Sequence, residues 1–246
     1  MLSSLAGLAC MAGCLWAQAP LYLGVVEFSG TGSRVRVAFE FRKEHWTPMP
    51  QNSREPAGVS WTIALDGRKL EPPPPRIREG AKKFENWLGT PPFRPLVVVS
   101  QANFRDPDRW KPFRAPAAML GETRVAFEVG KVQATCQGEP VEIRPERDLR
   151  LVPEAYRSAQ GYMLLALKFD IPKDVGEGIQ CETIWFLRKG DGFHYVGAGL
   201  ALLDAGDYDA DGTSEIIFAK SGYNLDGYVL LSVKDASTQS FVWTYH

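Results

Sequence analysis

The stretch from Asp207 to Glu215 constrains the fold of this chain more than any other. Aspartates alternate at 207, 209 and 211, a glycine follows the third, and a glutamate ends the string. Calcium takes roughly 6–8 oxygen ligands, and a chain supplies them locally only by coiling around the ion. We therefore interpret the string as a calcium loop with carboxylate ligands from Asp207, Asp209, Asp211 and Glu215. The alternative is an Asp/Gly-rich turn that binds no metal.

The backbone and the flanks of the loop distinguish it from an EF-hand. Gly212 permits a sharp turn, and the backbone carbonyl of Thr213 is a further expected ligand. An EF-hand needs a bidentate glutamate at its twelfth position, where this chain has Phe218. The apolar runs 202–203 and 216–218 are typical of strands rather than helices. The sequence therefore predicts a structural Ca²⁺ loop that joins two strands.

A strand, a DxDxDGxxE loop and a second strand resemble the FG-GAP/VCBS repeat of integrin-type β-propellers. The match covers residues 200–231, and all four carboxylates of the loop coincide with acidic positions of the motif. The resemblance implies that the loop lies within one blade of a propeller. It also implies a role in adhesion, ligand recognition or scaffolding. Such proteins usually carry several of these loops, and this chain contains one.

Short runs of β-branched and aromatic residues recur along the chain between Gly-, Pro- and Asp-Gly turn signals. We count about twelve to fourteen short strands, a pattern typical of an all-β propeller or sandwich. The expected fold is all-β and antiparallel with propeller-like blades, and the alternative is a pair of β-sandwiches. One all-β domain is expected at 20–246, with 183–246 as a blade-like calcium-binding unit. A strand is expected at 124–129, and only 153–160 has helical character.

Residues 1–19 carry no charge and are mostly apolar, as in a secretory signal peptide that lacks its basic start. Ala17-Gln18-Ala19 fits the small-residue rule for cleavage. The segment 11–14 resembles a bacterial lipoprotein box, with Cys14 as the lipidated residue. We therefore expect export to the periplasm, the cell surface or the medium. The alternative is an anchor helix, but the run is shorter than the ~20 residues that a span needs. No transmembrane span is expected in the mature chain.

Cys136 and Cys181 are the cysteines outside this leader. Two cysteines in an oxidising compartment favour a disulfide, and two buried free thiols are the alternative. The chain has no CxxC motif or Cys/His cluster, so a zinc site is not predicted.

The formal net charge of −1 predicts no general attraction to nucleic acid or to anionic membranes. Within 66–114, however, basic side chains outnumber acidic ones. We interpret this excess as a solvated face, and a binding patch is the alternative. An irregular arm is expected at 104–116, with its Asp and Arg side chains neutralising one another.

No catalytic motif is present. The chain lacks a GxSxG elbow, a P-loop and a complete GxGxxG, so neither catalytic residues nor a nucleotide-cofactor site is predicted. The histidines, His45, His194 and His246, lie outside any such pattern. Trp46, Trp87 and Trp110 lie in or beside loops rich in proline and charge, where they either stack on sugars, anchor a protein partner or fold back over the core.

The sequence as a whole predicts an exported, calcium-stabilised, β-rich module that binds an unidentified protein or carbohydrate. Binding is favoured over catalysis because no set of catalytic residues can be assembled from sequence. The alternative is an extracytoplasmic hydrolase, acting on glycans, with a structural calcium ion. A purely structural protein of the cell envelope is the third hypothesis.

Overall fold

The computed structural model describes residues 19–29, 32–65, 67–69, 95–130, 132, 134–136, 139–141, 148–152, 154–169, 182–222 and 224–245. The described part of the chain is mostly β, with 55% strand and 8% helix, and its sheets are antiparallel. This confirms the all-β class. Residues 1–18, which include most of the expected leader and the expected lipidation site Cys14, lie outside the described residues, and so does Cys181 of the expected disulfide. No described helix is both long enough and apolar enough to cross a membrane.

The N-terminal sheet has the strand order β3-β2-β1-β6-β4-β5, and every neighbouring pair is antiparallel. Its strands are β1 (Leu21–Ser29), β2 (Gly32–Arg42), β3 (His45–Pro48), β4 (Thr62–Leu65), β5 (Arg68–Lys69) and β6 (Leu96–Val99). In the long β1–β2 hairpin, residues 34–41 of β2 alternate in sequence with the two-residue period of a half-buried strand, whereas β1 is an apolar run. The irregular segment expected at 104–116 is in fact irregular only up to residue 110, because strand β7 (Lys111–Arg114) follows it. Residues 101–110, called the arm from here on, lead to the next sheet.

The second sheet has the order β14-β13-β12-β11-β7, and β10 also pairs with β12. Its strands are β7 (Lys111–Arg114), β10 (Leu149–Leu151), β11 (Glu154–Arg157), β12 (Met163–Phe169), β13 (Ile184–Lys189) and β14 (Gly192–Ala198). A short hairpin of β8 (Ala134–Cys136) and β9 (Glu139–Val141) stands apart. Two sequence-based expectations are wrong here, because β11 occupies the stretch expected to have helical character and β7 lies in the stretch expected to be irregular.

Helix α2 (Ala118–Val129) covers one face of the second sheet and replaces the strand expected at 124–129. Its buried residues are Met119, Thr123 and Phe127, four positions apart, so they form one helical stripe. Phe127 packs into a cluster with residues of β10, β12 and β13. Val125 and Val129, which alternate with Phe127 as in a strand, are 58% and 78% exposed. The helical period therefore determines which residues face the sheet.

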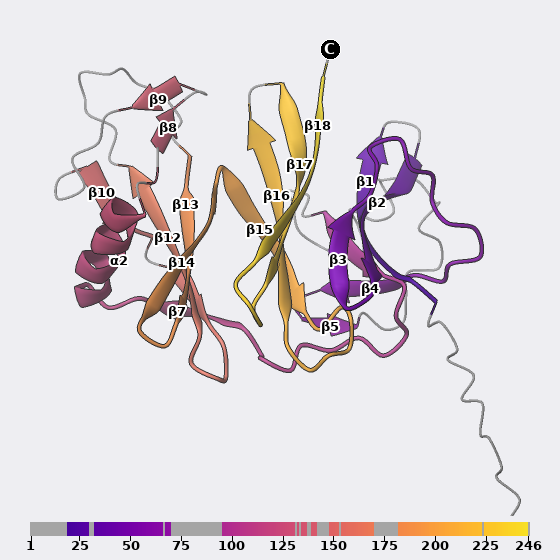
Figure 1. Cartoon of the computed structure of the whole chain (residues 1–246), viewed down its shortest axis with the longest axis horizontal. Coiled ribbons are helices and arrows are strands. Elements are labelled where there is room, and N and C mark those ends of the chain that lie inside the picture. Colours follow the sequence, from indigo (N-terminus) through magenta and orange to yellow (C-terminus); the bar gives the residue numbers. More distant parts are fainter. Residues whose placement is uncertain are drawn as a thin grey trace, which may run out of the picture.

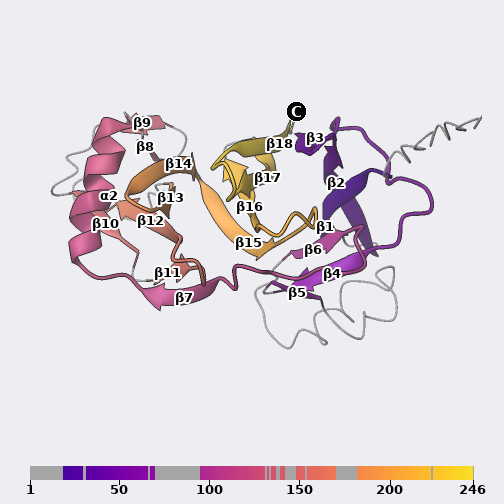
Figure 2. The same ribbon diagram turned by 60° about the horizontal axis from the view of Figure 1, so that its bottom comes forward.

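The C-terminal sheet consists of four consecutive antiparallel strands in the order β15-β16-β17-β18. They are β15 (Leu200–Gly206), β16 (Glu215–Gly222), β17 (Leu225–Ser232) and β18 (Thr238–Thr244). The region 184–198 belongs to the second sheet, so the four-stranded unit begins at Leu200. Figures 1 and 2 show this sheet, in gold and yellow, between the other two sheets.

Both faces of the C-terminal sheet are buried, and its residues alternate between two clusters. Ile217 and Leu230 pack with residues of the N-terminal sheet, while Ile216 and Leu231 pack with residues of the second sheet. This alternation follows from the two-residue period of a strand. The loop between β15 and β16, which carries the acidic string, thus projects from the central layer of the molecule.

Candidate metal centre

The two ends of the acidic loop are fixed by the strands it connects. Gly206, the last residue of β15, pairs with Glu215, the first residue of β16. The N–H of Tyr208 donates to Oε2 of Glu215 at 2.9 Å, and the N–H of Asp207 donates to the carbonyl of Arg105 at 2.9 Å. The strands expected on either side of the loop are confirmed, and their pairing brings its first and last carboxylates together.

Asp207, Asp209 and Glu215 converge on one point. Each offers a carboxylate oxygen, and these oxygens all lie within 4.8 Å of one another. Asp207 is 4% exposed and Glu215 is 2% exposed. Oδ2 of Asp207 accepts the N–H of Gly212 at 3.1 Å, but its Oδ1 is buried and has no hydrogen-bond partner among the residues that the structure describes. A buried, unpartnered carboxylate oxygen is unfavourable, and a cation at this position would satisfy it.

The pKa values of these carboxyl groups reflect their burial and their mutual repulsion. Burial raises the pKa of Glu215 well above its ordinary value, and the charge of Asp209 raises it further. Burial also raises the pKa of Asp209 to about 6. The pKa of Asp207 is raised by burial, although the hydrogen bond from Gly212 opposes the change. A divalent cation inverts this balance because it stabilises the ionised carboxylates.

Asp211 lies apart from these three carboxylates. Its Oδ1 accepts the N–H of Thr213 at 2.8 Å, and its Oδ2 forms an ion pair with Nζ of Lys234 at 2.9 Å. Lys234 follows β17, and no pattern in the sequence connects it with the loop. The structure therefore groups Asp207, Asp209 and Glu215 and places Asp211 opposite a lysine.

The turn itself requires left-handed backbone at two positions. Gly212 has φ of +91°, in agreement with the sharp turn expected there, and Ala210 has φ of +64°. The N–H of Asp211 donates to Oδ1 of Asp209 at 3.0 Å. The loop is thus shaped by its own carboxylates as well as by its glycine.

The arm holds the loop from the other side. Ser214 donates its N–H to Oδ2 of Asp108 at 3.0 Å and its hydroxyl to Oδ1 of Asp106 at 2.6 Å. The ring of Phe104 stacks on Tyr208 with centroids 5.3 Å apart. The sequence predicts that the arm's aspartates pair with neighbouring arginines, but in the described structure Asp106 and Asp108 accept hydrogen bonds from backbone N–H groups and from the hydroxyl of Ser214. Sequence spacing gives no signal for contacts over such a separation.

The other residues considered from sequence lie away from this centre. His45 and His194 are exposed, and within the described ranges neither hydrogen-bonds to a carboxylate. Trp46 is 7% exposed and belongs to the core cluster between the N-terminal and C-terminal sheets, so it folds back over the core. Trp110 lies in the arm and is half-buried.

No family profile, curated protein or solved structure matches this chain. What the protein does is therefore inferred from its own side chains.

Proposed function

We propose that the protein is a calcium-stabilised, β-rich binding module in which Asp207, Asp209 and Glu215 hold one Ca²⁺ ion. The observation that carries this proposal is the unpartnered, buried Oδ1 of Asp207 beside the other two carboxylates. The donor set contains only oxygen, which suits a hard cation such as Ca²⁺ rather than zinc or copper. The backbone carbonyl of Thr213 and the side chain of Asp211 remain proposed ligands from the sequence motif.

The proposed role of the ion is structural. It would neutralise carboxylates whose burial makes their ionised forms unfavourable. Because Glu215 begins β16 and Ser214 is bonded to the arm, the ion would also stabilise the junction between the central sheet and the arm. Extracellular calcium modules bind the ion with dissociation constants of roughly 10⁻⁴–10⁻³ M, which fits the export expected from the leader.

We also propose that the sheets are blades of an FG-GAP/VCBS-type propeller. Two features support this assignment: β15–β18 form a four-stranded meander, and the acidic loop joins its first two strands. Propeller blades are four-stranded sheets packed around a central channel. A crystal structure grown with calcium would test both the ligand set and the arrangement of the sheets about a common axis. Sheets stacked without such an axis would contradict the propeller.

Thermal unfolding tests the metal site directly. At free calcium about 100-fold above the dissociation constant, the ion should add about 2.7 kcal/mol, or about 5–10 °C in Tm for a chain of this size. Asp209→Asn keeps the shape of the side chain and should remove most of this increment, while far-UV circular dichroism stays unchanged. Asp191→Asn, an exposed aspartate in the β13–β14 turn, is the matched control and should retain it. Equal Tm values in millimolar calcium and in chelator would contradict the proposal.

Export is a separate part of the proposal and needs a separate measurement. Expression of the full chain in a bacterium, followed by mass spectrometry of the mature protein, would distinguish its forms. Cleavage after Ala19 would indicate a soluble exported protein, and a diacylglycerol on Cys14 would indicate a lipoprotein. Recovery of the intact chain in the cytoplasm would contradict export.

A further inference from the structure

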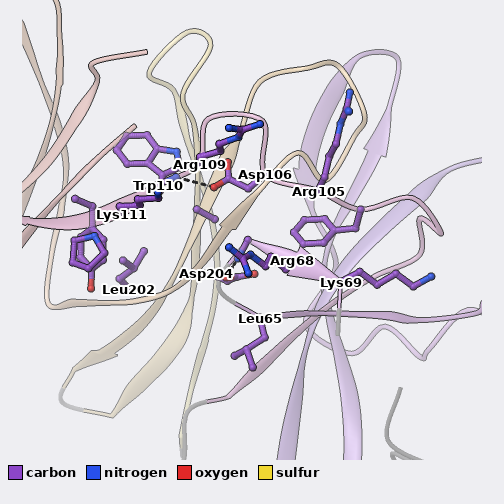
Figure 3. A pocket seen from close by; sticks show the side chains of 15 residues that line it. Leu65, Arg68, Lys69, Arg105, Asp106, Arg109, Trp110, Lys111, Leu202 and Asp204 are labelled. Atoms are coloured by element: carbon purple, nitrogen blue, oxygen red, sulfur yellow. Dashed lines mark hydrogen bonds between the residues drawn. The ribbon is translucent and has the colours of Figure 1, made fainter. Parts of the chain in front are cut away.

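A cleft of about 1180 Å³ opens between β5, the arm and β15, and its lining is rich in basic side chains (Figure 3). Those side chains are Arg68, Lys69, Arg105, Arg109 and Lys111. Two carboxylates, Asp106 and Asp204, also line it. In Figure 3, Lys69 and Arg105 extend away from the centre of the cleft. The charge that the cleft offers to a ligand therefore depends on whether the carboxylates of Asp106 and Asp204 already have hydrogen-bond partners within the protein.

Both carboxylates are occupied by hydrogen bonds within the protein. Oδ1 of Asp106 accepts the N–H of Asp108 and the hydroxyl of Ser214, and its Oδ2 accepts the N–H of Trp110 at 2.8 Å. Oδ1 of Asp204 accepts the N–H of Gly67 at 3.0 Å, and Asp204 itself is 3% exposed. Each acid is thus a hydrogen-bonded group of the cleft wall, and Asp204 is almost inaccessible from the cleft.

The basic side chains, in contrast, have room for a ligand. Arg68, Arg109 and Lys111 are exposed, and none forms an ion pair or a side-chain hydrogen bond with a described residue. The exposed guanidinium and ammonium groups of these three residues can therefore donate to the acceptor groups of an anionic ligand in the cleft.

The backbone of the arm turns sharply at Arg109. This residue has φ of +52°, which is unfavourable for a side chain other than glycine. The carboxylate of Asp106 accepts the N–H groups of the residues on both sides, Asp108 and Trp110, and so maintains this turn. Strained backbone that the surrounding structure enforces is typical of ligand-binding sites.

We propose that this cleft is the binding site of the module and that its ligand is an acidic oligosaccharide. The inference rests on the binding function proposed above and assigns it a site and a ligand class. Carboxylate or sulfate groups of the glycan would accept from Arg68, Arg109 and Lys111, and a sugar ring would lie against Trp110. A nucleic acid fits less well, because such binders carry a general basic surface, whereas this chain has a net charge of −1.

Calorimetric titration of the full chain, in saturating calcium, tests the proposal with three probes of equal length. Heparin hexasaccharide carries sulfates and carboxylates, hyaluronan hexasaccharide carries carboxylates alone, and chitohexaose is neutral. We expect binding of one or both acidic probes that weakens with salt, and no binding of the neutral one. Arg68→Ala and Arg109→Ala should each weaken binding by about tenfold. Arg54→Ala, an exposed arginine outside the cleft, should leave the affinity unchanged.

Trp110→Phe keeps an aromatic ring but offers a sugar a smaller face, and it should weaken binding by several-fold while the Tm stays close to that of the wild type. Three results would overturn the proposal: no binding of either acidic probe, affinities unaffected by Arg68→Ala and Arg109→Ala, or tighter binding of a single-stranded oligonucleotide. Melting of the same samples separates the two proposals. If calcium raises the Tm but no glycan binds, only the proposal of a glycan site in the cleft is wrong. If a glycan binds but calcium leaves the Tm unchanged, only the proposal of a calcium site is wrong.

Discussion

The backbone N–H of Ser214 lies 3.0 Å from Oδ2 of Asp108, a fully buried carboxylate 106 residues earlier in the chain. The other oxygen of Asp108, Oδ1, has no hydrogen-bond partner among the described residues. This contact joins the arm to the residue directly before Glu215, and thus joins the cleft to the metal centre.

Removal of the Asp108 carboxylate should destabilise the protein. Asp108→Ala leaves the N–H of Ser214 buried without an acceptor, which should lower the free energy of unfolding by about 1–3 kcal/mol. Chemical denaturation in chelator measures this cost without a contribution from calcium. The exposed turn variant Asp191→Ala is the control, and an unchanged free energy of unfolding in Asp108→Ala would contradict the importance of the contact.

Lys234 should compete with calcium for Asp211. Lys234→Met removes the ammonium group that pairs with Oδ2 of Asp211, so the carboxylate becomes available and calcium affinity should rise by several-fold. The pair is exposed, so the Tm in chelator should change little. Titration calorimetry with calcium measures the affinity. If Lys234→Met leaves it unchanged while Asp209→Asn reduces it, Asp211 is not a ligand of the ion.

Stability in chelator should increase as the pH falls through the pKa of Asp209. Burial raises this pKa to about 6 from an unfolded value of 3.8, so the folded state binds the proton more tightly than the unfolded state does. The stabilisation is complete below about pH 4 and is lost as the pH rises through about 6. The calcium increment should follow the opposite course, because protonated carboxylates do not bind the ion.

Comparison of the wild type with Asp209→Asn isolates the contribution of this carboxyl, since other titrating groups are shared. In chelator, the difference in Tm between the two proteins should change in size between about pH 5 and pH 7. A difference that does not vary with pH would show that Asp209 has an ordinary pKa in the folded protein.

Gly67 should tolerate substitution less well than Gly58. Both glycines have positive φ, of +68° and +76°. A Cβ at Gly67 would lie 2.7 Å from Cβ of Asp106, whereas a Cβ at Gly58 would meet nothing within 4 Å. Both alanine variants place a side chain at positive φ and so carry the same kind of backbone strain. The difference between their free energies of unfolding therefore measures the close contact between the β4–β5 hairpin, which contains Gly67, and the arm. We expect Gly67→Ala to be about 1–3 kcal/mol less stable than Gly58→Ala. Equal stabilities would indicate that the hairpin moves freely away from the arm.

Local patterns in the sequence predict the strands and the acidic loop, because both depend on residues that are near one another in the chain. The period of two predicts the β1–β2 hairpin, and the alternating aspartates followed by Gly212 predict a turn around a cation. The same logic fails at α2. Val125, Phe127 and Val129 alternate as in a strand, yet the buried stripe runs through Met119, Thr123 and Phe127, and it includes a threonine that a hydrophobic pattern omits.

The parts that sequence does not predict depend on contacts between distant segments. The pairing of Lys234 with Asp211 and the hydrogen bond from Ser214 to Asp108 bring together residues from different turns and sheets. From sequence, the excess of basic residues within 66–114 indicates a solvated face. Part of it lines the cleft, because the β4–β5 hairpin and the arm are adjacent only in the folded chain.

The sheet formed by β15–β18 is the middle layer of the fold, yet it follows both of its neighbours in the chain. During synthesis, the apolar faces of the two earlier sheets therefore remain exposed to solvent until β15–β18 have been synthesised. Folding of the nascent protein should be delayed until this insertion is complete. A chain truncated before Leu200 should expose the apolar faces of the N-terminal and second sheets, and we expect it to aggregate instead of folding into a smaller stable protein.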